Sequence, residues 1–155
     1  MNSAQNWFVH DHSQYEEKLS SCKEAIKLED WEKADAIFQE LVTQLKLHIT
    51  QEEEGVYPIY DALVKIPHDP TRTLRTEHDR IHCFMKDIKQ FIKTHDSKHG
   101  LECVDRLEDL LIRHQDKEED IFLPMAGYVL DFKFDDIKGK LGSSGLSVST
   151  RTWDI

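Results

Sequence analysis

Cysteine is scarce in this chain, and basic residues are outnumbered by acidic ones. The three cysteines, Cys22, Cys83 and Cys103, lie far apart and form no Cys-x-x-Cys motif, so they indicate neither a disulfide framework nor a thiolate zinc site. Lysine and arginine number 20 against 30 aspartate and glutamate residues, which gives a formal net charge of −10. This acidic balance argues against nucleic acid as a partner, because phosphates require a basic surface.

Long hydrophobic runs are also missing. No stretch is long enough to cross a bilayer, and residues 1–9 have neither the basic start nor the apolar core of a signal peptide. We therefore expect no membrane partner and, by default, a cytoplasmic location. The 155 residues, of which 39% are hydrophobic and 32% charged, suit one soluble, helix-rich domain with a full core.

An internal repeat with an offset of 66 residues is the most informative feature that is present. The segment 48–53 (HITQEE), followed by Pro58, matches the segment 114–119 (HQDKEE), followed by Pro124. The same shift carries Asp11-His12 onto Glu77-His78 and keeps apolar positions apolar. The chain therefore reads as two similar halves, each with a histidine on one helix and a His-x-x-x-Glu pair on the next.

Apolar residues recur at three- and four-residue steps in four segments, roughly 11–28, 30–52, 71–93 and 101–122, and this period predicts amphipathic helices. Short connections favour antiparallel neighbours, so we predict an all-α fold, an up-down-up-down antiparallel four-helix bundle over residues 1–134. Gly55 and Pro58 predict a kink or break. Residues 135–155 are expected to be a flexible C-terminal tail, with Trp153 and Ile155 able to dock on the bundle or on a neighbouring subunit.

Seven side chains in phase with these stripes are candidate metal ligands. Residues four apart lie on one face of a helix, so each His-x-x-x-Glu or His-x-x-x-His pair presents two donor atoms to the bundle interior. Burying these polar groups without a partner would be costly, and a metal ion satisfies them directly. The predicted ligands are His12, His48, Glu52, His78, His82, His114 and Glu118.

The number of donors indicates two ions with unequal surroundings. If Glu52 and Glu118 bridge two metals, three histidines complete one site and two complete the other: His78, His82 and His114 for the first, His12 and His48 for the second. An added oxide or hydroxide bridge leaves the second metal one open position for a small molecule. Imidazole and carboxylate donors suit two Fe ions, with Mn or Zn possible. The Glu-x-x-His pairs of ferritin-type bundles and the zincin motif are absent.

This set of motifs resembles the hemerythrin-like (HHE cation-binding) family. The resemblance covers roughly residues 8–130 and implies a four-helix bundle with a non-haem di-iron centre that binds O2 end-on. Oxygen-carrying hemerythrins have an aspartate five residues after the last histidine, whereas here Glu118 stands four after His114 and Glu119 five after it. Either glutamate is thus a candidate bridge, and the chain looks more like the bacterial and regulatory branch of the family.

Three kinds of function follow from this resemblance. The first is reversible binding of O2 or NO for oxygen storage, delivery or sensing, and it makes the chain a binding protein rather than an enzyme. The second is an enzyme of nitrosative or oxidative stress that reduces NO or peroxide or repairs iron-sulphur clusters. The third is a metal-dependent signalling module that uses its tail. A homodimer is compatible with each of them.

Overall fold

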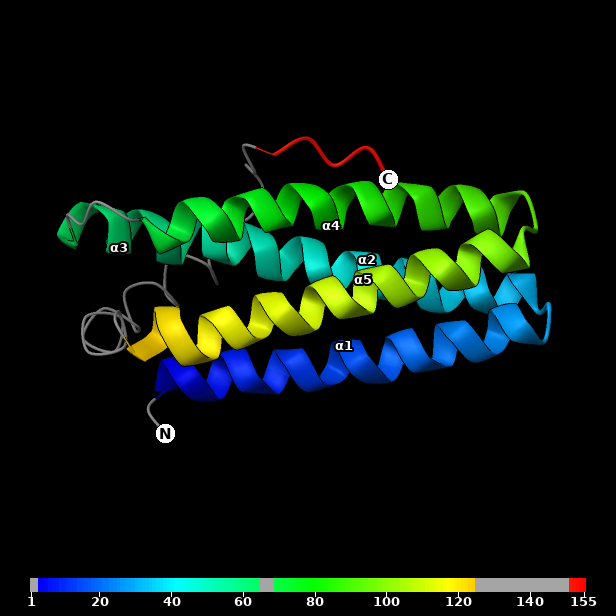
Figure 1. Cartoon of the computed structure of the whole chain (residues 1–155), viewed down its shortest axis with the longest axis horizontal. Helices are drawn as coiled ribbons and strands as arrows, with labels where there is room; N and C mark the ends of the chain where they lie inside the picture. Colours follow the sequence, from blue (N-terminus) through cyan, green and yellow to red (C-terminus); the bar gives the residue numbers. More distant parts are fainter. Residues whose placement is uncertain (1–2, 65–68, 125–150) are drawn as a thin grey trace.

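Four long helices form an antiparallel bundle in the computed structural model, which describes residues 3–64, 69–124 and 151–155 (Figure 1). They are α1 (Ser3–Lys27), α2 (Trp31–Gln51), α4 (Pro70–Lys93) and α5 (Ser97–Lys117). Helix α1 packs against α2 and α5, and α4 packs against the same two helices. The predicted all-α fold is confirmed, whereas the expected boundary at residue 134 lies outside the described residues.

Two π-helical segments extend the bundle at one end. Segment η1 (Glu52–Val56) joins α2 to the short helix α3 (Tyr57–Leu63), and η2 (Glu118–Phe122) follows α5. The backbone N–H groups of Tyr57 and Leu123 donate to the carbonyls of Glu52 and Glu118, five residues back. The kink expected at Gly55 and Pro58 is therefore a widened helical turn, which accommodates a proline that lacks an N–H.

The two tight connections at the opposite end also repeat at 66 residues. Asp30 accepts the N–H of Lys33 and Asp96 accepts that of His99, so each aspartate caps the helix that follows it. The cap at Asp96 explains why α5 begins at Ser97, earlier than the expected residue 101. Helix α1 begins at Ser3 rather than near residue 11, since no proline or glycine interrupts residues 3–11.

Apolar stripes from all four long helices meet along the bundle axis. Ile26, Phe38, Met85 and Leu107 are completely buried there. A second apolar cluster, which includes Tyr57 and Tyr60 of α3 and Phe122 of η2, lies at the end of the bundle where the π-helical segments are. None of the described helices is both long and apolar enough to span a membrane.

Candidate metal centre

Buried histidines and glutamates converge at the end of the bundle where the π-helical segments lie. Helices α1 and α4 begin at this end, whereas α2 and α5 end there, so residues from the N-terminal part of one helix pair meet residues from the C-terminal part of the other. Ligand atoms of Glu52, His78, His114 and Glu118 lie within 4.8 Å of one another, and those of His12, His48 and Glu118 form a second such group. Six of the seven residues expected from the sequence are thus brought together.

The two glutamates connect the two groups. The Nε2 atom of His48 lies 2.7 Å from Glu52 Oε1, and that of His78 lies 3.0 Å from Glu52 Oε2. Likewise, His12 Nε2 is 3.1 Å from Glu118 Oε2, and His114 Nε2 is 3.0 Å from Glu118 Oε1. Each carboxylate therefore contacts one histidine with one oxygen and a second histidine with its other oxygen, as a bridging ligand would.

His82 has a different position from the other predicted ligands. It lies one turn beyond His78 on α4, is partly exposed, and its Nε2 atom is 2.9 Å from Asp154 Oδ1 in the C-terminal segment. Within the described residues it belongs to neither of the two groups. Glu16, which stands opposite His82 in the repeat, is exposed.

Three further glutamates hold the outward-facing nitrogens of the inner histidines. His12 Nδ1 lies 2.7 Å from Glu119, His78 Nδ1 lies 2.8 Å from Glu53, and His114 Nδ1 lies 2.9 Å from Glu77. Such carboxylates fix the ring orientation of a ligating histidine and raise its basicity. Glu119 therefore takes this outer position, while Glu118 faces both groups. The sequence repeat could have identified these residues. Its 66-residue offset pairs Glu53 with Glu119, and it aligns Glu77, which precedes His78 in the sequence, with Asp11 before His12.

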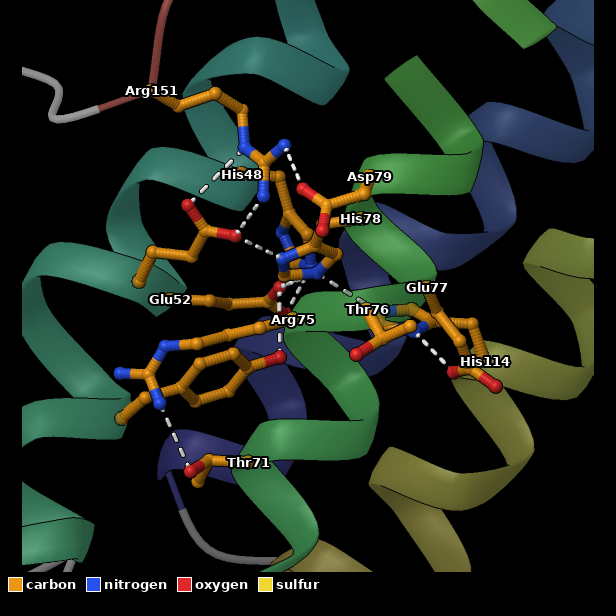
Figure 2. Close-up of polar contacts among 12 residues, drawn as sticks. His48, Glu52, Thr71, Arg75, Thr76, Glu77, His78, Asp79, His114 and Arg151 are labelled. Carbon is orange, nitrogen blue, oxygen red and sulfur yellow. Dashed lines mark hydrogen bonds and ion pairs between the residues drawn. The ribbon is translucent and has the colours of Figure 1, made fainter. Parts of the chain in front are cut away.

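Tyr57 contacts both of the completely buried carboxylates, Glu52 and Glu118. Its buried hydroxyl group is 3.3 Å from Glu52 Oε2 and 3.2 Å from Glu118 Oε1, and its ring stacks on that of His78 with centroids 5.8 Å apart. Burial first, and then the two negative charges, raise the pKa of this phenol well above its usual value. Tyr57 therefore stays protonated and acts as a hydrogen-bond donor. Figure 2 shows the contacts around His78, Glu52 and His114.

The donor atoms of these groups suit a cation between them. If the Nδ1–H group of each ring donates a hydrogen bond to its outer glutamate, a neutral His78 and a neutral His114 direct the lone pairs of Nε2 inward, yet these Nε2 atoms lie only 3.2 Å apart. Within the described part of the chain, Glu52 Oε1 and Glu118 Oε2 also accept no well-oriented hydrogen bond, although both are completely buried. Acceptor atoms facing one another at such distances repel unless protons or metal ions lie between them.

Without a metal ion, protons are held at this site by its negative charge. Burial alone would lower the pKa of His114, but the adjacent Glu118, with help from Glu77 and Glu52, outweighs burial and raises it to about 10. Burial likewise opposes ionisation of Glu118, yet His114 and His12 keep its pKa well below the usual value. The centre is thus an array of ionised carboxylates and protonated imidazole that a metal ion would enter by displacing protons.

Comparison with known families agrees with this geometry. The family model of the hemerythrin HHE cation binding domain matches residues 4–126. The chain belongs to this family. No curated protein and no solved structure matches it significantly. The hemerythrin HHE domain accounts for the whole bundle, and the buried His/Glu cluster is its candidate metal site.

Proposed function

We propose that this hemerythrin HHE domain holds two iron ions and reversibly binds O2, or NO, for storage, delivery or sensing. The observation that carries the proposal is the sharing of Glu52 and Glu118 between two pairs of buried histidines. Carboxylates that connect two such groups are typical of two-metal sites. A pair of iron ions would supply the redox chemistry that uptake of O2 or NO requires.

The residues of the chain have separate tasks in this proposal. Two histidine pairs, His78 with His114 and His12 with His48, each hold one ion, and Glu52 and Glu118 bridge the ions. Apolar side chains exclude water and so restrict proton access, which favours release of the bound molecule unchanged. The side chains expected to form this wall are all buried in the core: Leu45, Ile81, Met85 and Leu111.

The test is metal analysis combined with optical spectroscopy. Protein loaded with Fe2+ without oxygen is expected to contain two irons per chain and to develop an absorption band in O2 that disappears when O2 is removed. Glu118→Gln should lose most of the iron, because both groups use this carboxylate. Glu16→Gln, a change of the same chemistry at an exposed position, should retain it. Wild-type protein that binds no iron would refute the proposal.

Enzymatic reduction of NO is the second candidate, and one contact favours it. His12 is hydrogen-bonded to Glu119, whose side chain is 38% exposed, so a polar connection runs from the centre to solvent. Proton delivery requires such a connection. The same iron-loaded sample, given a chemical reductant and NO, distinguishes the two functions: sustained NO consumption supports the enzyme, whereas a single stoichiometric uptake supports the binding protein.

A further inference from the structure

The C-terminal segment Arg151–Ile155 lies along α4 (Figure 1) and contacts His82 and Glu53, which neighbour the candidate metal centre. Trp153 and Ile155 pack against the apolar core, and the Trp153 ring meets that of His82 edge-on, with centroids 5.3 Å apart. Lys46 of α2 lies 5.7 Å from the same indole ring. The segment therefore contacts both α2 and α4 close to the turn that carries His82.

Asp154 contacts the Nε2 atom of His82. In the four inner histidines, Nε2 is the nitrogen that points toward the site. His12, His48, His78 and His114 all use Nε2 toward the two bridging glutamates. His82 Nε2 instead lies 2.9 Å from Asp154 Oδ1, while Lys86 holds the other oxygen of Asp154 at 2.7 Å. His82 follows His78 by one helical turn, and so lies on the same face of α4. The carboxylate of Asp154 is thus bound to the nitrogen atom with which His82 would bind a metal.

Arg151 connects the same segment to a second histidine. Its guanidinium lies 2.7 Å from Glu53 Oε1, the oxygen that also contacts His78 Nδ1 at 2.8 Å. Figure 2 shows Arg151 reaching toward Asp79 and the outer side of His78. The segment therefore touches the surroundings of both histidines of α4, one through Asp154 and one through Glu53.

We propose that the segment Arg151–Ile155 is a built-in competitor for His82, in which Asp154 keeps this histidine out of the metal centre until the segment is released. In the docked state the centre has the four inner histidines; in the released state His82 joins His78 and His114. This inference rests on the proposed metal binding. Release is feasible because Asp154 and Lys86 are about half exposed, and ion pairs at exposed positions contribute little.

The first experiment compares Zn2+ affinities by competition with a chromogenic chelator. Asp154→Asn keeps the shape of the side chain but removes its charge, so the dissociation constant of one Zn2+ is expected to fall about five-fold. In a His82→Gln background the same substitution should change nothing, because the histidine that is set free is missing. Asp87→Asn is the matched control, since it removes an equal charge from an exposed position on α4.

The second experiment follows Trp153 directly by fluorescence. In a chain with Trp7→Phe and Trp31→Phe, Trp153 is the only tryptophan. Saturating Zn2+ is expected to shift its emission to longer wavelength, because metal binding and segment docking oppose each other and this coupling is reciprocal. Asp154→Asn should show the shifted emission before any Zn2+ is added.

The outcomes separate this inference from the proposed function. Wild-type protein that binds neither Fe2+ nor Zn2+ would refute the metal centre itself. Two ions per chain with equal affinity in wild type and Asp154→Asn, or weaker binding in the variant, would leave the centre intact and overturn the competition. An unchanged Trp153 emission at saturating Zn2+ would overturn it as well.

Discussion

More carboxylates than histidines lie at the candidate metal centre. Glu52 and Glu118 face inward, while Glu53, Glu77 and Glu119 hold the outer nitrogens of three rings. Arg151 and Lys117 neutralise two of the outer glutamates, Glu53 and Glu77. The two completely buried carboxylates, Glu52 and Glu118, then have only the histidines and Tyr57 as partners in the metal-free protein. Because buried charge is costly when it lacks a partner, these residues favour bound cations on electrostatic grounds as well as by geometry.

Removal of one hydroxyl group tests the part played by Tyr57. Tyr57→Phe should lower the free energy of unfolding of the metal-free protein by about 1–2 kcal/mol, since Glu52 and Glu118 lose a buried donor. Urea denaturation measures the loss. Zn2+ should reduce it, because the cations then stabilise both carboxylates.

Tyr60→Phe is the matched control for this prediction. Tyr60 is equally buried and packs against Phe122, but its hydroxyl group has no hydrogen-bond partner among the described residues. Removal of the Tyr60 hydroxyl group should leave the free energy of unfolding nearly unchanged. A loss at Tyr57 that grows when Zn2+ is bound would instead make the phenol oxygen a metal ligand.

The pKa of His114 predicts how stability depends on pH. Its value of about 10 in the folded protein exceeds the ordinary 6.5, mainly because Glu118 outweighs the effect of burial. A raised pKa stabilises the fold fully below pH 6.5, and this contribution is lost as pH rises through about 10. The melting temperature of metal-free protein should therefore fall between pH 7 and pH 10, and His114→Gln should fall less.

Metal binding should remove this dependence, because a ligating His114 carries no proton at Nε2. Zn2+ uptake at pH 7 should consequently release protons, which calorimetry in buffers of different ionisation enthalpy detects. A melting temperature that is flat from pH 7 to pH 10 in metal-free protein would contradict the assigned protonation.

At the level of helices, one glycine offers a simple test of how α5 begins. Gly100 lies in the first turns of this helix, and a Cβ atom placed there would meet Phe91 at 3.6 Å and Ile26 at 3.9 Å, which are ordinary packing distances. Gly100→Ala should therefore raise the free energy of unfolding by about 0.5–1 kcal/mol by restricting the unfolded chain. Thermal unfolding measures the gain, and metal content should not change. A lower melting temperature would show that Phe91 and Ile26 cannot accommodate the methyl group.

Helical periodicity predicted the long helices and their inward faces well, because both depend on local spacing. The residue pairs His48 with Glu52 and His114 with Glu118 follow directly from this spacing. The π-helical turns were anticipated only as a kink, since Gly55 and Pro58 signal an irregularity without specifying its hydrogen bonds. The contact of His82 with Asp154 could not be predicted from local spacing, because the two residues are 72 positions apart in the sequence and meet only through tertiary packing.

At the scale of the whole molecule, the 66-residue repeat appears as an approximate two-fold relation between the halves. Helices α1 and α2 with η1 correspond to α4 and α5 with η2, and each half contributes one completely buried glutamate at the start of its π-helical segment. The C-terminal segment breaks this relation because it contacts α4 and α2. The two candidate metal positions therefore have similar ligands but different neighbours, and we expect them to fill with different affinities.

The position of the histidines at one end has a consequence for how the protein matures. Away from the histidines, completely buried apolar side chains fill the axis, among them Ile26, Phe38, Ile88 and Leu107. This apolar core can hold the helices together before any metal is bound, so a metal ion would enter a site that is already formed and would not be needed for folding. Metal-free protein would then be folded, with protons at the site until a metal ion replaces them.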